Sequence, residues 1–187
     1  MMRQWVACVV VALVAVAAAA MEIAGVTLPD TTTVNGSTLQ LNGMGVRTKT
    51  FLKVKVYVGG LYLATPSNDA GAIIAADEPK QVLMHFLYSK VEKDKLTEAW
   101  REGFANNSSA ALPTLTARLE KFCALWPDMA SGERAVITYL PGTGTRLELK
   151  GKEAGVIPGK DFADAMFAVW LGGKPADAGL KAGMLGK

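Results

Sequence analysis

The alternating run between residues 51 and 63 constrains the fold of this chain more than any other feature. From Lys53 to Val58 every second residue is valine, and the residues between them are lysine or tyrosine. A β-strand points successive side chains to opposite faces, whereas a helix would scatter these valines around its axis. The pattern therefore predicts a strand over Phe51–Leu63. Gly59-Gly60 interrupts it, which indicates a bulge or the close approach of another backbone.

The remaining patterns place short strands first, helices in the middle, then a hairpin and further helices. Apolar alternation and turn signals predict strands at Val26–Leu28, Thr38–Leu41, Gln81–Tyr88, Arg134–Leu140 and Thr145–Lys150. Helical spacing predicts helices at Asp69–Ala76, Val91–Asn107, Pro113–Trp126, Asp161–Leu171 and Pro175–Leu185. This order predicts an α+β fold with a mainly antiparallel sheet, because a Rossmann-type sheet needs regularly alternating strands and helices.

The first twenty residues have the pattern of an export signal. Arg3 precedes an apolar run from Trp5 to Ala20, and the run ends in three alanines that provide an A-x-A cleavage pattern. We expect a signal peptide over residues 1–20, cut after Ala20, and a single domain over residues 21–187 in the periplasm or outside the cell. The alternative is an uncleaved anchor, since the run is at the short edge of spanning length. No later stretch is long enough to span a membrane.

The inventory of reactive side chains excludes several chemistries. The chain has one histidine and two cysteines, and only Cys123 remains after the expected cleavage, so neither a disulfide nor a Cys/His zinc site is predicted. The formal net charge is +3 and the lysines are dispersed, which argues against a nucleic-acid partner. No nucleotide-binding loop is present, and we expect no cofactor and no metal. We interpret Cys123 as a buried small hydrophobe and His85 as a structural residue of its strand.

Arg47 is the candidate binding residue that the sequence itself suggests. It lies in Gly43–Lys49, which leads directly into the alternating strand, and the glycines there allow close backbone approach. A planar guanidinium that faces an enclosed pocket suits a carboxylate ligand. The alternative is an arginine paired with an internal aspartate or glutamate, or one exposed at the strand end.

The segment Gly45–Leu63 resembles the core segment of chalcone isomerase-like proteins, and looks most like the exported bacterial branch of that family. The resemblance continues through Leu96–Phe104 and Phe167–Gly172, with further matches at Pro175–Asp177 and Leu180-Lys181. It implies an open-faced β-sandwich, in which a large antiparallel sheet is covered by helices. This agrees with the α+β fold that the patterns predict.

The resemblance transfers only one catalytic position of the plant enzymes. Arg47 matches their arginine, whereas Tyr57 stands at the position of their strand threonine. Their tyrosine and asparagine positions fall near Glu92 and Ala99, and their late polar position falls near Val169. Cyclisation of a chalcone needs polar groups that place the ketone and the phenolate. The replacements imply that this chain does not carry out that reaction.

Relatives of the same fold in plastids are non-catalytic fatty-acid binders, in which the corresponding arginine and a tyrosine hold the carboxylate. We therefore expect a non-catalytic domain that binds a small amphipathic carboxylate, such as a fatty acid, in an apolar cleft. Arg47 would be its anchor, and the hydroxyls of Thr48, Tyr57 and Tyr62 are the further candidate contacts. One alternative is an isomerase or intramolecular lyase that acts on a chalcone-like or enone substrate. The other is an envelope protein-interaction domain without a ligand.

Overall fold

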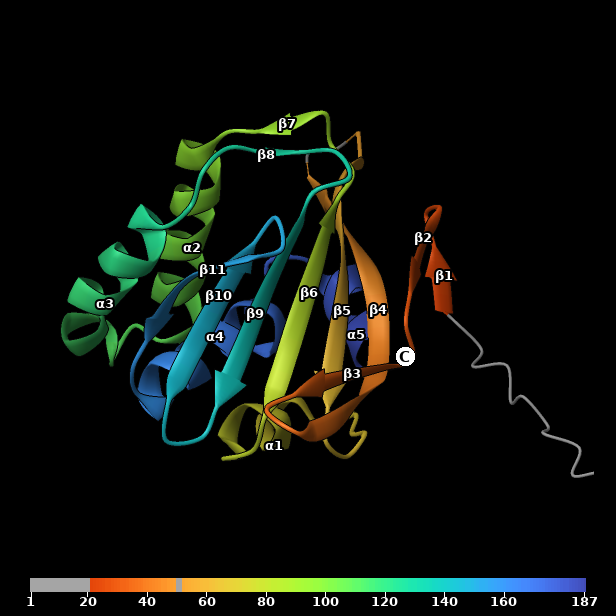
Figure 1. Ribbon diagram of the computed structural model, residues 1–187. Coiled ribbons are helices and arrows are strands. Elements are labelled where there is room, and N and C mark those ends of the chain that lie inside the picture. The colour runs from red at the N-terminus through yellow and green to blue at the C-terminus, as the bar shows by residue number, and fades with distance from the viewer. Residues whose placement is uncertain (1–20, 50–51) are drawn as a thin grey trace, which may run out of the picture.

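A single antiparallel sheet forms the centre of the computed structural model, which describes residues 21–49 and 52–187. Its seven strands stand in the order β11-β10-β9-β6-β5-β4-β3 (Figure 1). Their bounds are β3 Thr31–Val34, β4 Ser37–Lys49, β5 Val54–Leu63, β6 Lys80–Phe86, β9 Arg134–Leu140, β10 Gly144–Leu149 and β11 Lys152–Ile157. Two small ribbons flank the sheet: β1 Met21–Ile23 with β2 Val26–Leu28, and β7 Lys90–Val91 with β8 Met129–Ala130.

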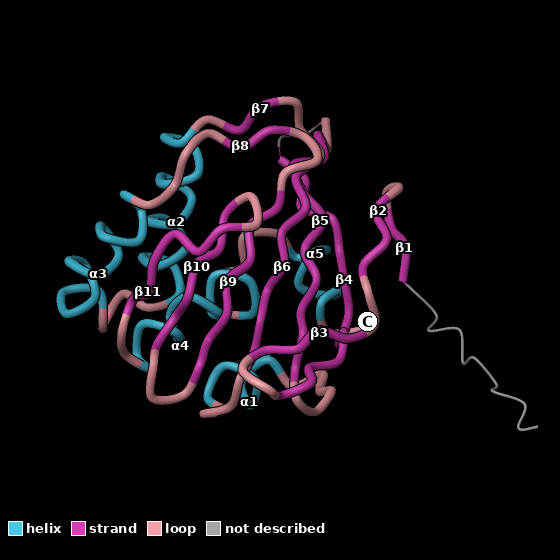
Figure 2. Tube along the Cα trace, viewed as in Figure 1, coloured by secondary structure: helices cyan, strands magenta, loops and turns pink. Residues whose placement is uncertain are grey.

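The described helices cover one face of this sheet (Figure 2). They are α1 Ala70–Ala75, α2 Lys93–Asn107, α3 Leu112–Ala124, α4 Lys160–Leu171 and α5 Ala178–Met184. Helix α4 contacts α1, α2 and β10, α3 contacts α2 and β11, and α5 lies on β4 and β5. Among residues 21–49 and 52–187, no helix has the length and apolar composition that crossing a membrane requires.

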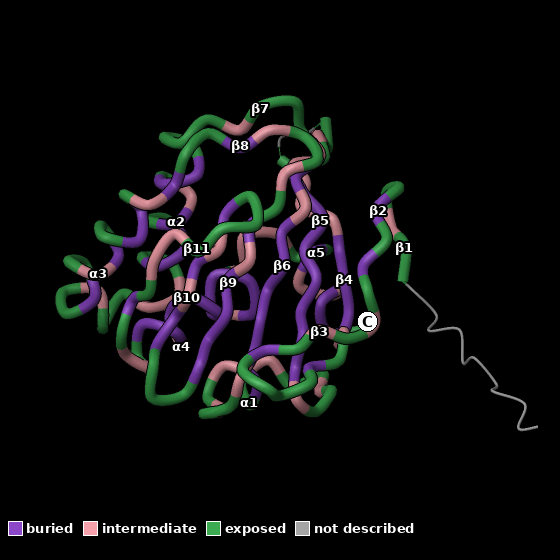
Figure 3. The backbone as a smooth tube through the Cα atoms, viewed as in Figure 1, coloured by how far each residue is buried: buried purple, intermediate pink, exposed green. Residues whose placement is uncertain are grey.

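Each face of the sheet has its own apolar core, and the central strands are buried along most of their length (Figure 3). The larger core lies between the sheet and the helices and contains Trp100, Trp126 and Trp170. The smaller core lies on the opposite face, where Leu28 of the β1–β2 ribbon packs with Tyr62. Strand β5 serves both cores because its side chains alternate between the faces.

Glycines let α5 approach the sheet closely. A Cβ atom on Gly43 would overlap the carbonyl oxygen of Gly183, and one on Gly45 would lie 3.0 Å from the Leu180 Cα. Gly59 faces the same helix, since a Cβ there would meet the Met184 side chain at 2.6 Å. The glycines of β4 and β5 therefore make room for a helix of the chain itself.

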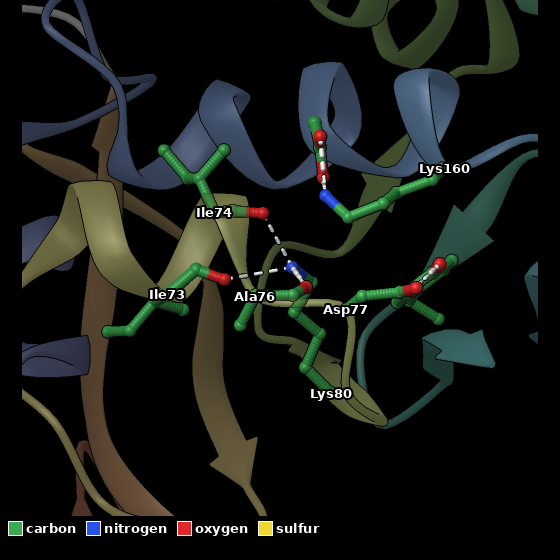
Figure 4. Close-up of polar contacts among 8 residues, drawn as sticks. Ile73, Ile74, Ala76, Asp77, Lys80 and Lys160 are labelled. Carbon is green, nitrogen blue, oxygen red and sulfur yellow. Dashed lines mark hydrogen bonds and ion pairs between the residues drawn. The ribbon is translucent and has the colours of Figure 1, made fainter. Parts of the chain in front are cut away.

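The buried side chain of Lys80, in β6, caps the C-terminal end of α1 on the helix-covered side of the sheet (Figure 4). Lys80 is 1% exposed, and its ammonium group donates hydrogen bonds to the carbonyl oxygens of Ile73, Ile74 and Ala76 at 2.8, 2.7 and 2.9 Å. It also lies 5.4 Å from the centre of the Tyr139 ring and 5.2 Å from that of Phe167. Burial lowers the pKa of Lys80 to about 8, although the nearby Asp164 carboxylate acts in the opposite direction.

The expected α+β fold with an antiparallel sheet covered by helices is confirmed. The strand predicted at Thr38–Leu41 is part of the much longer β4, and β11 was not predicted at all. Gly59-Gly60 does not mark a bulge, because both residues pair in register with β4 and β6. The expected signal peptide and residues 50 and 51 of the predicted Phe51–Leu63 strand lie outside the described residues.

Candidate functional site

A pocket of about 630 Å³ lies between one end of the sheet and the start of α2. Its sheet wall consists of Arg47, Lys49, Val54, Val56 and Tyr57, and its other wall consists of Tyr88, Ser89, Lys90, Val91, Glu92, Lys95, Leu96 and Ala99. The walls are mostly apolar, whereas the charged residues other than Arg47 are exposed. The volume falls within the range of small-molecule sites in proteins.

An irregularity in β5 shapes the sheet wall. Arg47 pairs with Tyr57, but the next residue of β4, Thr48, pairs with Lys55, so Val56 has no partner in β4. The carbonyl oxygen of Val56 instead accepts hydrogen bonds from the backbone N–H groups of Leu87 and Tyr88 at 2.9 and 3.2 Å. Such a bulge breaks the strict alternation of side chains. Val56 and Tyr57 consequently both line the pocket, although they are consecutive residues.

Arg47 lies on the pocket wall without a carboxylate partner in the described part of the chain. No ion pair or hydrogen bond joins its guanidinium to any residue of 21–49 or 52–187, and its Nε atom is buried without a partner. The guanidinium carbon lies 5.7 Å from the centre of the Tyr57 ring, which is within cation–π distance. The positive charge therefore faces the pocket and leaves hydrogen-bonding capacity for an anion.

Tyr57 links the pocket wall to the aromatic core. The side chain is 1% exposed, and its hydroxyl accepts a hydrogen bond of 2.9 Å from the indole N–H of Trp170 on α4. Its ring also packs against Phe86 at a centroid distance of 5.7 Å. These contacts fix the ring under Arg47, so Tyr57 holds the guanidinium in position, while its hydroxyl is directed to the core.

Thr48 and Tyr62 do not line the pocket. The backbone N–H and the hydroxyl of Thr48 both donate to the Asp177 Oδ2 atom at 3.0 Å. The Tyr62 hydroxyl lies on the opposite face of the sheet, where it donates to the Pro29 carbonyl oxygen at 2.9 Å. Tyr57 and Tyr62 point to opposite faces of the sheet, because side chains alternate along a strand and these two residues are an odd number of positions apart. Of the expected ligand contacts, the pocket brings together Arg47 and Tyr57 only.

Asp177 ties the end of β4 to the first turn of α5. Its Oδ1 atom accepts a hydrogen bond from the Leu180 backbone N–H at 2.8 Å, which caps the helix. Burial acts to raise the pKa of Asp177, but the hydrogen bonds from Leu180 and Thr48 outweigh it and hold the pKa below 3.8. The carboxylate therefore fixes the backbone immediately beside Arg47.

Basic residues outnumber acidic ones among the exposed residues around the pocket. Lys90 pairs with Asp128 at 2.9 Å and Lys95 pairs with Glu98 at 3.2 Å. Lys49 has no ion-pair partner among the described residues, and Glu92 is the acidic residue of the pocket lining. Together with Arg47, this distribution favours an anionic ligand over a cationic one.

The other reactive side chains lie outside the pocket. The Nδ1 atom of His85 accepts a hydrogen bond from the Arg134 Nε atom at 3.2 Å, and burial, together with Arg134, lowers the pKa of this histidine. Cys123 is a buried free thiol, as predicted, and burial raises its pKa to about 11. No group of three metal-binding side chains gathers within residues 21–49 and 52–187.

The whole region from residue 20 to residue 186 matches the model of the family described as chalcone isomerase-like. The chain belongs to the chalcone isomerase-like family. The resemblance seen in the sequence is thereby confirmed. A search of curated protein sequences finds no significant match.

Solved structures of this fold match the chain as well. A crystal structure of a fatty-acid binding protein from Arabidopsis thaliana superposes with a TM-score of 0.70 at 16% sequence identity. The match covers 89% of this chain and 96% of the plant protein. At this identity the match establishes the shared fold, and the binding property is that of the plant protein.

The pocket also contains positions that the family comparison singled out in the sequence. Glu92 and Ala99, which stand near the tyrosine and asparagine positions of the plant enzymes, both line the pocket. Val169 does not, because its side chain packs on α2 at Gly103. Val91 of β7 and Leu96 of α2, which line the pocket, were not predicted as site residues. Their apolar spacing in the predicted helix was the available signal, but it did not show which of them would face a pocket.

Proposed function

We propose that this domain binds a small amphipathic carboxylate, such as a fatty acid, without catalysing a reaction, in a location reached by export. Its carboxylate would contact Arg47, and its aliphatic chain would lie along the apolar walls of the pocket. The observation that carries the proposal is the guanidinium of Arg47, which lies on a pocket of about 630 Å³ and has no ion-pair partner among residues 21–49 and 52–187.

The electrostatic part of the proposal rests on how Arg47 is held. Tyr57 and the Trp170 hydrogen bond behind it keep the guanidinium at the wall, so little conformational freedom is lost when a ligand binds. An arginine binds a carboxylate by donating two parallel N–H hydrogen bonds to its oxygens. A hydrogen bond to a charged group contributes about 1.5–3 kcal/mol.

The apolar part of the proposal rests on the lining. Val54, Val56, Val91, Leu96 and Ala99 present aliphatic carbons from both walls. Transfer of each methylene group of a ligand from water to such a surface contributes about 0.8 kcal/mol. An aliphatic chain of about ten or more carbons therefore contributes about 8 kcal/mol or more, which together with the arginine contact offsets the entropic cost of association.

The test compares fatty-acid binding by the wild type with that by Arg47→Met, using native mass spectrometry and calorimetry at micromolar ligand. We expect one fatty acid per wild-type chain and an affinity lower by about tenfold to a hundredfold in Arg47→Met. Arg134→Met is the matched control, because Arg134 lies on the same sheet, has no ion-pair partner in the described ranges and does not line the pocket. It should bind like the wild type.

Two outcomes would contradict the proposal. The first is that neither the wild type nor Arg47→Met binds a fatty acid at micromolar levels. The second is a rate of chalcone cyclisation, or of isomerisation of another enone, that exceeds the rate in buffer and falls in Arg47→Met. That result would support the isomerase alternative.

A further inference from the structure

We propose that the end of the molecule where the pocket opens docks on an anionic lipid bilayer through Leu52 and the lysines around it. This docking surface consists of Lys49, Leu52, Lys53, Lys55 and Tyr88. The docking itself does not require a pocket ligand, whereas its use in exchanging an amphipathic carboxylate with the bilayer rests on the proposed function.

The apolar part of the docking surface consists of the two side chains with the highest exposed fractions among the large hydrophobic residues described. Leu52 is 70% exposed and Tyr88 is 47% exposed. Leu52 lies in the turn between β4 and β5, where Lys53 has a φ of 49°. The β4–β5 turn and the β7–β8 ribbon lie at the same end of the sheet (Figure 1). A highly exposed leucine in a turn can enter the interface of a bilayer without any change of the fold.

The charged part consists of lysines that the protein does not neutralise. Lys49, Lys53 and Lys55 are exposed, and none has an ion-pair partner among the described residues. Lys90, which follows Tyr88 closely, pairs with Asp128, and Glu92 is the nearby exposed carboxylate. The net charge of this end is positive, and basic residues next to an anionic lipid surface each strengthen binding about fivefold.

The size of the apolar area favours a bilayer over a protein partner. A stable protein interface buries about 1,000 Å² or more around a central apolar cluster. Leu52 and Tyr88 are separate side chains on two loops, and Lys49, Lys53 and Lys90 are close to them along the chain. This pattern, with few apolar side chains and several basic ones around them, suits the headgroup region of a membrane.

The docking surface adjoins the pocket opening, so docking would bring the pocket next to the bilayer. Lys49 and Tyr88 belong to both, because they also line the pocket beside Arg47. A domain docked through this surface would turn the pocket opening toward the lipid. An amphipathic molecule could then pass between bilayer and pocket with little exposure of its aliphatic chain to water.

The test is co-sedimentation with vesicles of equal parts phosphatidylcholine and phosphatidylglycerol, compared with vesicles of phosphatidylcholine alone. The wild type should bind the mixed vesicles, and binding should weaken as salt is added. Leu52→Ser should lower the partition coefficient about tenfold, and the double variant Lys53→Gln/Lys55→Gln should lower it about 25-fold. The matched controls are Val156→Ser, at a valine 38% exposed on β11, and Lys121→Gln/Lys174→Gln at exposed lysines elsewhere.

The controls should bind within about twofold of the wild type, because the lysine control removes equal charge, and the valine control an exposed apolar side chain, away from the docking surface. Equal binding to both kinds of vesicle, no binding to either, or equal losses in the controls would overturn the proposal. Loss in the lysine variant with none in Leu52→Ser would point to an acidic macromolecule and would also overturn it. Arg47→Met should keep vesicle binding while its fatty-acid affinity falls by about tenfold to a hundredfold, so the two proposals can fail separately.

Discussion

Replacing Lys80 by methionine keeps an unbranched stem of four heavy atoms but removes the terminal ammonium group. In the wild type this group donates three hydrogen bonds of 2.7 to 2.9 Å to carbonyl oxygens at the end of α1. Each hydrogen bond to a charged group contributes about 1.5–3 kcal/mol, and removal of the donor leaves buried acceptors unpaired. The release of a buried charge offsets part of this loss. We expect Lys80→Met to unfold with a free energy lower by about 2–4 kcal/mol at pH 7.

The pH dependence of this difference gives a sharper test. The pKa of Lys80 is lowered to about 8 in the folded chain from an ordinary value of 10.5. Between these pH values the unfolded chain binds more protons at this position, so the contribution of Lys80 to the free energy of unfolding rises with pH. Titratable groups distant from position 80, such as Cys123, titrate equally in both proteins and cancel in the difference.

Urea unfolding of both proteins at pH 7, 8, 9 and about 10 measures this effect, with m-values checked for equality. The difference in unfolding free energy between wild type and Lys80→Met should widen above pH 8. If this free-energy difference became smaller as the pH rises, the three hydrogen bonds would raise the pKa of Lys80 by more than burial lowers it. Equal free energies of unfolding for the wild type and Lys80→Met at pH 7 would refute the proposal that Lys80 stabilises the C-terminal end of α1.

Further predictions concern α5 and the thiol. Gly43→Ala should destabilise the fold by about 1–3 kcal/mol in urea unfolding, because its Cβ would meet the α5 backbone; Gly173→Ala, with open space around it, should have no measurable effect. The free energy contributed by Asp177 is present at neutral pH and lost as the pH falls below about 4, because its folded pKa is lowered. Asp177→Asn should therefore be less stable at pH 7 and less sensitive to acid, and equal sensitivity would contradict this. The thiol of Cys123 has a pKa of about 11. At pH 8 it should react with a disulfide reagent more than about a hundredfold more slowly in the folded chain than in the unfolded chain, as followed by mass spectrometry. Equal rates in the two states would contradict the burial of this thiol.

Periodicity made most of the fold predictable from the sequence. The hairpin of β9 and β10 has apolar alternation around a Pro-Gly turn, and helices α2 and α3 have one apolar face each. Strand β4 was mostly missed because Asn42, Gly43 and Gly45 lower its strand propensity, and their reason is tertiary, in the close packing of α5. Strand β11 was missed because its sequence has no clear alternation of apolar and polar residues. Its Gly155 is covered by Leu125, which follows α3.

The candidate site was predictable at Arg47 but not in its surroundings. The sequence suggested the arginine and the family resemblance supported it, whereas the orientation of Tyr57 depends on the bulge at Val56, which no sequence pattern indicated. The sequence could not show whether Arg47 forms an ion pair within the protein, because this depends on which carboxylates the fold brings close to it. Asp177 is a half-buried carboxylate beside Arg47 in the fold, and it is occupied by hydrogen bonds from Thr48 and from the first turn of α5.

The most direct measurement of whether Arg47 recognises a carboxylate is a comparison of two ligands on two proteins. A saturated fatty acid and the alcohol of the same chain length are titrated into the wild type and into Arg47→Met. The wild type should bind the acid at least about tenfold more tightly than the alcohol, and Arg47→Met should show no such preference. Equal affinities of the wild type for the two ligands, or a preference that survives in Arg47→Met, would contradict the account.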